Sequence, residues 1–238
     1  MLQRNGRPDL MASIMAVGGD KLGPHLKQRP VRQGEVLVRE GEPIDAVFFP
    51  CDAVLSRIIS LDRERSLAVG LVGSEGFVGI PLLLGVGIGN ANVKVEIPGE
   101  GWRMPAADFD RLIVKERGEA YNILLQYVNV FMGRCAQTAA CSSLHGFKQR
   151  LASWLLLTLD AADTPELPVT HDFLANVLGV RRPTVSITAN ALRQKGLIEY
   201  HRGKLQVLNR EALERISCDC YFIVRGLTQE LLAQPAAV

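Results

Sequence analysis

Hydrophobic positions between about residues 31 and 104 come in short runs that glycine and proline separate. The runs are rich in Val, Ile and Phe, as in the segments VRQGEVLVREGEP, DAVFFPCDAVLSRIIS and ANVKVEIPGEGWRM. Runs of about four to eight such residues between turn residues are typical of antiparallel strands. The pattern therefore predicts a small antiparallel sandwich or barrel in the first half of the chain.

The pattern becomes helical after residue 118. No proline occurs between Gly118 and Ser142, and apolar side chains recur there at intervals of three and four residues. Such intervals place side chains on one face of a long helix. The apolar seam of this helix consists of Leu124, Val128, Phe131, Cys135 and Thr138. It can pack on its own domain or against the same helix of a second chain, and the pattern favours neither alternative.

A second helical segment covers about residues 145–162. It ends at ADTPELPVT, where two prolines cannot continue a helix. Strand-like patterns before residue 118 and helical patterns after it predict an α+β protein with two domains.

The segment after these prolines has the spacing of a helix-turn-helix. Thr170 is a suitable N-cap for a short helix, and Gly179 supplies a sharp turn where a positive φ is needed. Ala175, Gly179 and Val185 follow one another at intervals of four and six residues. Pro183 fits the first turn of the second helix. This combination is typical of a helix-turn-helix whose second helix lies in the major groove of DNA.

The second helix of this motif has one apolar face and one polar face. Val185, Ala189 and Leu192 form the core face. The opposite face carries the candidate base contacts, which are Arg182, Thr184, Ser186, Ile187 and Asn190. Among them, Arg182 can donate two hydrogen bonds to guanine, and Ile187 can contact a thymine methyl group.

A β-hairpin with a cationic tip follows the second helix. Two strand-like pieces, Leu197–Tyr200 and Leu205–Leu208, flank a tight turn over residues 201–204, as in the wing of a winged helix. The net charge is only +2, but seven cations between Arg181 and Arg210 face a single acidic residue, Glu199. Such a basic stripe indicates phosphate binding. We expect contacts to the DNA backbone from Thr170, Arg181, Arg193, Lys195, Arg202 and Lys204.

Composition and cysteine usage exclude several other classes of protein. Hydrophobic residues make up 47% of the chain and charged residues 22%, so most of the chain is not disordered. No apolar run reaches the roughly 18 residues that cross a membrane, and no apolar stretch follows a charged N-terminus. The five cysteines are an odd number, which indicates a reducing compartment. We therefore expect a cytoplasmic protein without a membrane anchor.

Over nearly its whole length the chain resembles the Crp/Fnr superfamily of bacterial transcription regulators. The matching segments are GEVLVREGEP, EGFVGIPLLL and LGVRRPTVSITANALRQKGLI. The resemblance implies a cyclic-nucleotide-binding-like sensor β-roll over residues 1–117 and a dimerisation helix over residues 118–143. It implies a winged helix-turn-helix DNA-binding domain over residues 144–238.

The same resemblance implies the partners. It favours the second alternative for the apolar seam, which becomes the interface of a homodimer. The dimer is expected to bind double-stranded DNA at a near-palindromic site, with recognition helices about 34 Å apart. RNA polymerase is a further partner if the regulator is an activator.

Two departures from the family pattern change these expectations. Members that bind cyclic nucleotides have a Gly-Glu pair and a later Arg-Ser or Arg-Thr pair. Here Gly79 is followed by Ile80 and Pro81, and the later position is Asn90 and Ala91. Without a cation that faces the phosphate, a buried anion is costly. We expect these five residues to line an effector pocket that does not bind cAMP in the family's way, so no cofactor is predicted and the effector is unknown.

The recognition helix departs from the family pattern as well. The family's Ser-Arg-Glu-Thr-Val stands here as RRPTV, so the arginine is kept at Arg182 and Pro183 replaces the glutamate that accepts from cytosine. Ile187 stands where relatives have a later arginine. The DNA half-site is therefore expected to differ from the familiar one.

The cysteines do not match a familiar ligand set. No cysteine precedes Cys51, so the iron–sulfur cluster of some relatives is not expected. Cys218 and Cys220 form a Cys-x-Cys pair, and Cys135 and Cys141 lie on or just after the long helix. Zinc usually has four ligands at recognisable spacing. We therefore interpret the cysteines as isolated thiols and predict no metal site, with a redox or metal switch as the alternative.

No arrangement of catalytic residues is visible. The four histidines are scattered, and neither a Ser/His/Asp set nor a pair of carboxylates is apparent. We therefore do not expect an enzyme. Two other classes are alternatives: a small-molecule-binding regulatory module that acts through protein contacts, and a thiol-based redox enzyme that uses Cys218 and Cys220.

Overall fold

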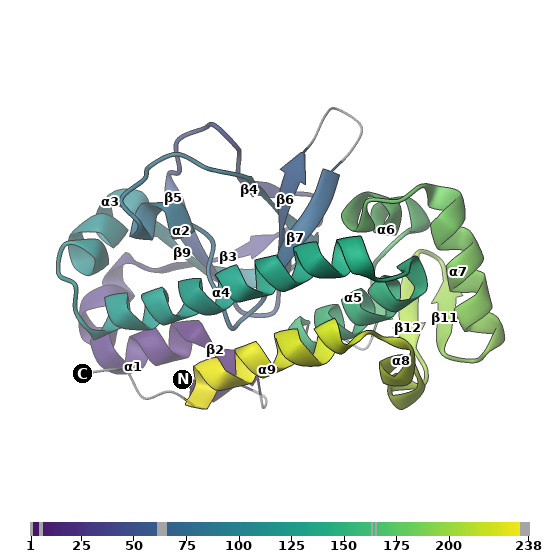
Figure 1. The fold of residues 1–238 in the computed structure, drawn as a ribbon. Coiled ribbons are helices and arrows are strands. Elements are labelled where there is room, and N and C mark those ends of the chain that lie inside the picture. Colours follow the sequence, from purple (N-terminus) through teal and green to yellow (C-terminus); the bar gives the residue numbers. More distant parts are fainter. Residues whose placement is uncertain (1, 5–6, 61–65, 163, 165, 234–238) are drawn as a thin grey trace.

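The structure, a computed structural model, describes residues 2–4, 7–60, 66–162, 164 and 166–233 (Figure 1). Two short strands, β1 (Leu2–Arg4) and β2 (Arg7–Asp9), pair antiparallel ahead of helix α1 (Leu10–Leu22) and a 3-10 turn, η1 (Gly23–His25). The Asp9 carboxylate begins α1 as an N-cap that accepts from the backbone N–H of Ala12 at 2.8 Å. α1 packs on the long helix α4 (Glu119–Leu144), and the sequence patterns did not predict it.

The β-roll consists of two antiparallel sheets. One has the strand order β3-β9-β5 and the other β4-β8-β6-β7. The strands are β3 (Lys27–Val31), β4 (Val36–Val38), β5 (Ala46–Pro50), β6 (Val54–Ser60), β7 (Ser66–Val72), β8 (Asn92–Ile97) and β9 (Gly99–Pro105). The predicted antiparallel sandwich is confirmed.

A short helix, α2 (Ile80–Leu83), lies between β7 and β8 and begins after a glycine that the fold requires. Gly79 has a φ of 118°, and a Cβ there would lie 2.6 Å from Cγ1 of Val47. Only glycine combines this backbone conformation with so close an approach. The turn therefore fixes where the chain enters α2.

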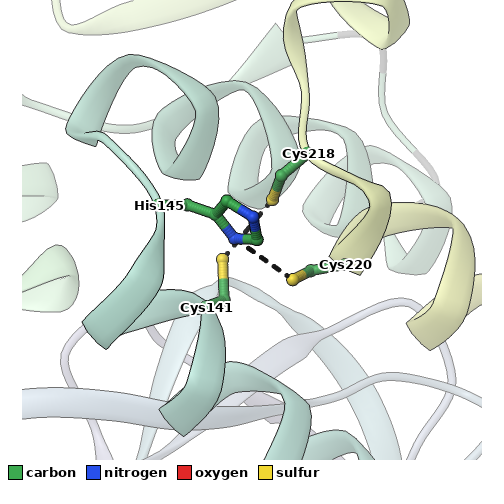
Figure 2. Close-up of side chains that lie close together, drawn as sticks. All are labelled: Cys141, His145, Cys218 and Cys220. Atoms are coloured by element: carbon green, nitrogen blue, oxygen red, sulfur yellow. Dashed lines mark hydrogen bonds between the residues drawn. The ribbon is translucent and has the colours of Figure 1, made fainter.

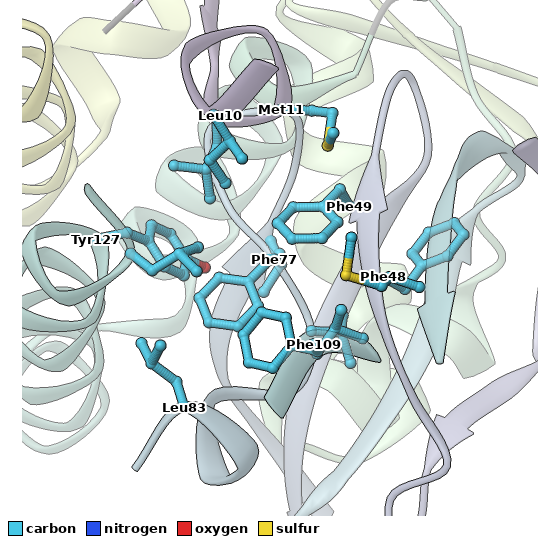
Figure 3. Close-up of a cluster of buried hydrophobic side chains, with 14 of the residues drawn as sticks. Leu10, Met11, Phe48, Phe49, Phe77, Leu83, Phe109 and Tyr127 are labelled. Carbon is cyan, nitrogen blue, oxygen red and sulfur yellow. The ribbon is translucent and has the colours of Figure 1, made fainter. Parts of the chain in front are cut away.

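Helix α4 follows a short helix, α3 (Ala106–Phe109), and a π-turn, η2 (Asp110–Val114). The first half of α4 completes the core of the roll, in which aromatic rings gather around Phe77 (Figure 3). The ring centroid of Phe77 lies 5.5 Å from that of Tyr127 and 5.7 Å from that of Phe49. Each fully buried side chain of this kind contributes about 1.5–3 kcal/mol, so α4 belongs to the roll as much as to the helical half of the chain.

The apolar seam of α4 corrects the predicted dimer interface. Leu124, Val128 and Phe131 are 0%, 7% and 4% exposed, because they pack into the roll of the same chain. Side chains buried in their own core cannot reach a second chain, so the assignment of these three to the interface is wrong. Cys135 and Thr138 are half-buried, and the Thr138 hydroxyl donates to the Arg134 carbonyl at 2.9 Å. An apolar seam on a helix predicts that this face is buried, but it does not distinguish packing within the chain from packing against a second chain.

A buried ion pair fixes the middle of α4 to the roll. Nη1 of Arg134 lies 2.7 Å from Oε1 of Glu75, and both side chains are 7% exposed. The same guanidinium donates to the Leu71 carbonyl at 3.0 Å. Such a pair tolerates little movement, because separating two buried charges costs several kcal/mol.

The second half of the chain is helical apart from a small sheet of order β10-β12-β11. Its elements are α5 (Phe147–Ala161), β10 (Glu166–Leu167), α6 (His171–Leu178), α7 (Arg182–Gln194), β11 (Ile198–His201), β12 (Lys204–Val207), α8 (Arg210–Ile216) and α9 (Asp219–Ala233). The last helix, α9, lies alongside α4 (Figure 1).

The core of the helical half includes residues of the roll. Val54 and Leu71 of the roll pack with Leu155 of α5 and Leu178 of α6. Gln33 of the roll also donates to the Pro168 carbonyl at 2.6 Å. Among the described residues, no helix combines the length and the apolar character that crossing a bilayer demands.

Candidate nucleic-acid interface

The structure confirms the predicted helix-turn-helix. The backbone N–H of Phe173 donates to the Thr170 hydroxyl at 3.1 Å, which caps α6, and Gly179 makes the turn with a φ of 64°. Helix α7 begins at Arg182, followed by Pro183. The predicted core face of α7, Val185, Ala189 and Leu192, is buried against the rest of the motif.

The opposite face of α7 is exposed to solvent. Arg182, Thr184 and Asn190 all lie on it, and Ile187 is 71% exposed. A single exposed apolar side chain is ordinary on a protein surface, and here it leaves Ile187 accessible to a partner. These four predicted base contacts therefore share one accessible surface.

Ser186 does not fit the role predicted for it. Its side chain is half-buried, and its Oγ lies 2.9 Å from Nδ1 of His171. This hydrogen bond joins α7 to α6 inside the motif. Because the hydroxyl already has a partner there, the structure does not support Ser186 as a base contact.

The wing is a hairpin with a two-residue turn. Arg202 and Gly203 have φ values of 49° and 80°, and His201 pairs with Lys204. Two successive positive φ angles are typical of the type I′ turn that matches the twist of paired strands. The strands β11 and β12 therefore extend into the predicted four-residue turn, which places Arg202 and Lys204 at an exposed tip.

A hollow of about 440 Å³ lies between α6, α7 and the wing. Its lining includes Arg182, Asn190 and Arg193, together with residues that the sequence analysis did not single out: His171, Asp172 and Tyr200. The signal for two of them was their place directly after the N-cap Thr170, since the first turn of α6 faces the start of α7.

Two side chains of this hollow, Asp172 and His171, interact with Arg182. Nε of Arg182 lies 3.2 Å from Oδ1 of Asp172, and both side chains are about two-thirds exposed. Exposed pairs of this kind contribute little, about 0–1 kcal/mol, so the guanidinium is easily released. Burial, and then the nearby charge of Arg182, lower the pKa of His171, which favours its neutral imidazole.

The remaining predicted backbone contacts surround this surface. Arg181, Arg193 and Lys195 are exposed on or beside α7. Lys204 of the wing lies 3.1 Å from Glu166 of β10, again with both side chains exposed. The cations of the predicted basic stripe are therefore exposed on α7, beside it and on the wing, and together they are called the cationic margin.

The five residues predicted to line an effector pocket lie around one cavity of about 360 Å³ between the roll and α4: Gly79, Ile80, Pro81, Asn90 and Ala91. Most of the lining is apolar and includes Phe131 and Met132 of α4. Arg57 of β6 also lines the cavity. The expectation that no cation faces this space is therefore wrong, because the cation comes from a strand outside the compared motif.

The interpretation of the cysteines as isolated thiols is also wrong. Cys141, Cys218 and Cys220 lie together with His145, and their sulfur and imidazole nitrogen atoms are all within 4.8 Å of one another (Figure 2). Cys51 and Cys135 are not part of this group. Sequence reasoning missed it because His145 was considered apart from the cysteines.

Two protein-family models match the chain. A cyclic nucleotide-binding domain matches residues 28–116, and a Crp-like helix-turn-helix domain matches residues 149–216. The first range falls on the roll and the second on α5 through α8. The chain is also 23% identical over 216 residues to the Global nitrogen regulator of Synechococcus elongatus, an alignment that covers 87% of this chain and 96% of the relative.

Solved structures show the same fold. A transcriptional regulator of the CRP family from Thermus thermophilus matches with a TM-score of 0.67 and 18% identity, over 79% of this chain and 96% of the other. A CRP/FNR family regulator from the same organism matches with a TM-score of 0.62 and 22% identity, over 80% and 98%.

Proposed function

Since the chain belongs to the Crp/Fnr superfamily of transcription regulators and binds DNA through its helix-turn-helix domain, we propose that it acts as a homodimer on a near-palindromic site, with α7 in the major groove. The observation that carries the proposal is the exposed face of α7. Arg182 stands at its first turn, where its Nε pairs with the exposed Asp172. Once released from this weak pair, the guanidinium can bind guanine O6 and N7 together.

The neighbours of Arg182 set the rest of the half-site. Pro183 has no side-chain acceptor for cytosine, and Ile187 offers an apolar surface for a thymine methyl group. Thr184 and Asn190 are short hydrogen-bonding side chains on the same face. We therefore propose a half-site with one guanine and a neighbouring thymine as its principal determinants.

The cationic margin supplies affinity that does not depend on sequence. Arg181, Arg193 and Lys195 flank α7, while Arg202 and Lys204 reach from the wing. Contacts with phosphates position the protein and release counterions, so they strengthen binding to every duplex alike.

A different face of α4 supports the dimer. Crp-family regulators are typically dimeric, and the side chains of Asn129, Met132, Ala136 and Ala139 are exposed along α4 at intervals of three and four residues. Met132 is 66% exposed. This spacing suits two helices that pack side by side, so this stripe replaces the buried seam as the proposed interface.

The cavity in the roll is the proposed effector site. Its apolar lining together with Arg57 suits a small molecule that has an apolar body and an anionic group. Binding there would favour one of two arrangements of the dimer's recognition helices, and contact with RNA polymerase would follow if the protein activates transcription.

Selection of bound duplexes from a random pool tests the proposal. We expect enriched sites with two inverted half-sites whose centres are about one helical turn, roughly 34 Å, apart. Met132→Glu should yield a monomer by light scattering and lose the two-fold sites, while the buried-core control, Leu124→Met, should stay dimeric. Enrichment of single half-sites by the wild type would contradict the dimer, and no enrichment at all would contradict sequence-specific binding.

A further inference from the structure

Two segments that lie far apart in the sequence meet where α4 ends and α9 begins. Cys141 lies in the last turn of α4 and His145 directly after it, while Cys218 directly precedes α9 and Cys220 lies in its first turn. Sγ of Cys141 is 3.5 Å from Sγ of Cys218, and Sγ of Cys220 is 3.4 Å from Nδ1 of His145. Figure 2 shows the four side chains pointing toward a common centre.

These distances suit a tetrahedral metal site. Zinc binds thiolate sulfur at about 2.3 Å and imidazole nitrogen at about 2.0–2.1 Å, so neighbouring ligand atoms of a tetrahedron lie about 3.5–3.8 Å apart. Both of the distances above are within a few tenths of an ångström of that value. The widest separation, at most 4.8 Å, needs only a small movement of side chains to close.

The chemistry of the donors selects the ion. Three sulfurs and one imidazole prefer zinc and similar borderline or soft ions, whereas magnesium and calcium require oxygen ligands. Cys141, Cys218 and Cys220 are 9%, 3% and 6% exposed, so the site is closed on the side of the sulfurs. Four protein ligands leave no position for substrate, as in structural rather than catalytic zinc sites.

The surroundings of the sulfurs support thiolate ligands. Nε2 of Gln137 donates to Sγ of Cys220 at 3.0 Å, and Oγ of Ser153 lies 3.2 Å from Sγ of Cys218. Hydrogen bonds of this kind orient metal ligands and stabilise their charge. Cys218 and Cys220 also stand at the N-terminus of the 15-residue helix α9, where the helix dipole favours a negative charge.

From this arrangement we infer that Cys141, His145, Cys218 and Cys220 form a metal site for one zinc ion. Binding replaces the protons of the three thiols by the ion, so three protons are released, and the imidazole binds in its neutral form. The bound ion fastens the end of α4 to the beginning of α9. Since Ser153 comes from α5, the site also touches the first helix after α4.

The position of the ion gives it a role beyond stability. α9 follows the wing and α8, so the ion connects α4 with the last helix of the DNA-binding half. Losing the ion would remove one of the contacts that hold the DNA-binding half against α4, beside the packing of α9 along α4. This consequence rests on the proposed function, whereas the binding of metal does not.

Metal analysis of protein purified under reducing conditions without chelators tests the site. We expect about one zinc per chain in the wild type and in the control Cys51→Ser. Cys218→Ser and Cys141→Ser should fall to the metal content of the buffer. Equal zinc in wild type and Cys218→Ser would overturn the proposal, as would a wild-type mass that shows a Cys141–Cys218 disulfide and no metal.

A second measurement guards against variants that fail to fold. Cobalt(II) added to the metal-free wild type should give the intense visible bands of tetrahedral thiolate coordination, with zinc displacing it. His145→Cys keeps four ligands and should bind cobalt with stronger sulfur charge-transfer bands. Bands typical of octahedral cobalt in the wild type would overturn the proposal. None of these measurements involves DNA, so their failure would leave the proposed function untouched.

Discussion

The cavity of the roll and the cysteine–histidine cluster both border α4, yet they have opposite designs. The cavity is roomy and mostly apolar, and its polar groups, Arg57 and Asn90, come from separate strands or loops. The cluster is compact and brings four potential ligands to one point. A mostly apolar space places few chemical demands on a ligand, whereas three thiols and an imidazole at one point select among metal ions. Among the described residues, the more closely defined set of donor atoms therefore lies at the end of α4 and not in the region that matches the cyclic nucleotide-binding domain.

Removing the metal should produce the largest loss of stability, and it tests whether the cysteine–histidine cluster binds an ion. We expect a strong chelator under reducing conditions to lower the free energy of unfolding by about 5 kcal/mol, or about 10–20 °C in Tm for a chain of this size. Cys218→Ser should match the chelated wild type and no longer respond to chelator. The measurement is thermal melting by circular dichroism with Cys51→Ser as the control. A wild-type Tm that chelation leaves unchanged would reduce the cluster to ordinary packing.

The next effect concerns the ion pair that lies between the two regions. Arg134→Met leaves the Glu75 carboxylate buried without its partner, and we expect a loss of about 3–5 kcal/mol in urea denaturation. The double variant Glu75→Gln/Arg134→Met removes both charges and should recover most of the loss. A single variant as stable as the double would show that the charge of Glu75 is not held in place by Arg134.

The effect of single substitutions on DNA affinity distinguishes a contact with a base from a contact with a phosphate. Arg182→Ala should cost about 1–3 kcal/mol of affinity at the selected site and relax the preference at one base pair. Lys204→Ala is the matched control, because losing a phosphate contact weakens binding to all duplexes alike. Titrations by fluorescence anisotropy at fixed salt measure both. Unchanged affinity in Arg182→Ala would favour a regulatory module that acts through protein contacts.

The smallest effect comes from a buried acid of the roll. Burial raises the pKa of Glu96, although the hydrogen bond from Ser56 and the charge of Lys94 oppose the shift, and its Oε2 has no hydrogen-bond partner among the described residues. A raised pKa in the folded state means that stability is greatest below the unfolded pKa and is lost as pH rises through the folded pKa. Glu96→Gln should therefore gain about 1 kcal/mol at pH 7 over the wild type. Thermal melting from about pH 5 to about pH 8 should show a Tm that depends less on pH in this variant than in the wild type.

Local spacing explains what could be predicted from the sequence. Thr170, Gly179 and the core face of α7 lie within one short segment, so their spacing alone predicts the helix-turn-helix. The place of the effector cavity followed from resemblance, but its chemistry did not, because Arg57 belongs to a strand outside the matched motif. The same limit applied to α1, whose partner α4 is far away in the chain.

The metal site shows the limit most clearly. Cys141 and His145 are four residues apart, the spacing at which two side chains at a helix end share one face. Taken together with the Cys218 and Cys220 pair, that spacing was a signal. Yet 72 residues lie between His145 and Cys218, and only the return of α9 along α4 brings the two pairs together. Composition and spacing could identify the potential ligands, but they could not show that the fold brings them together.

Helix α4 is also a rigid lever. Val128 borders the cavity and Cys141 belongs to the cluster, and the 13 steps from position 128 to position 141 span about 20 Å at about 1.5 Å each. A tilt of about 6° about one of these points displaces the other by about 2 Å over that length. Arg134 lies between the two positions, so its buried pair with Glu75 opposes such a tilt and couples both sites to the roll.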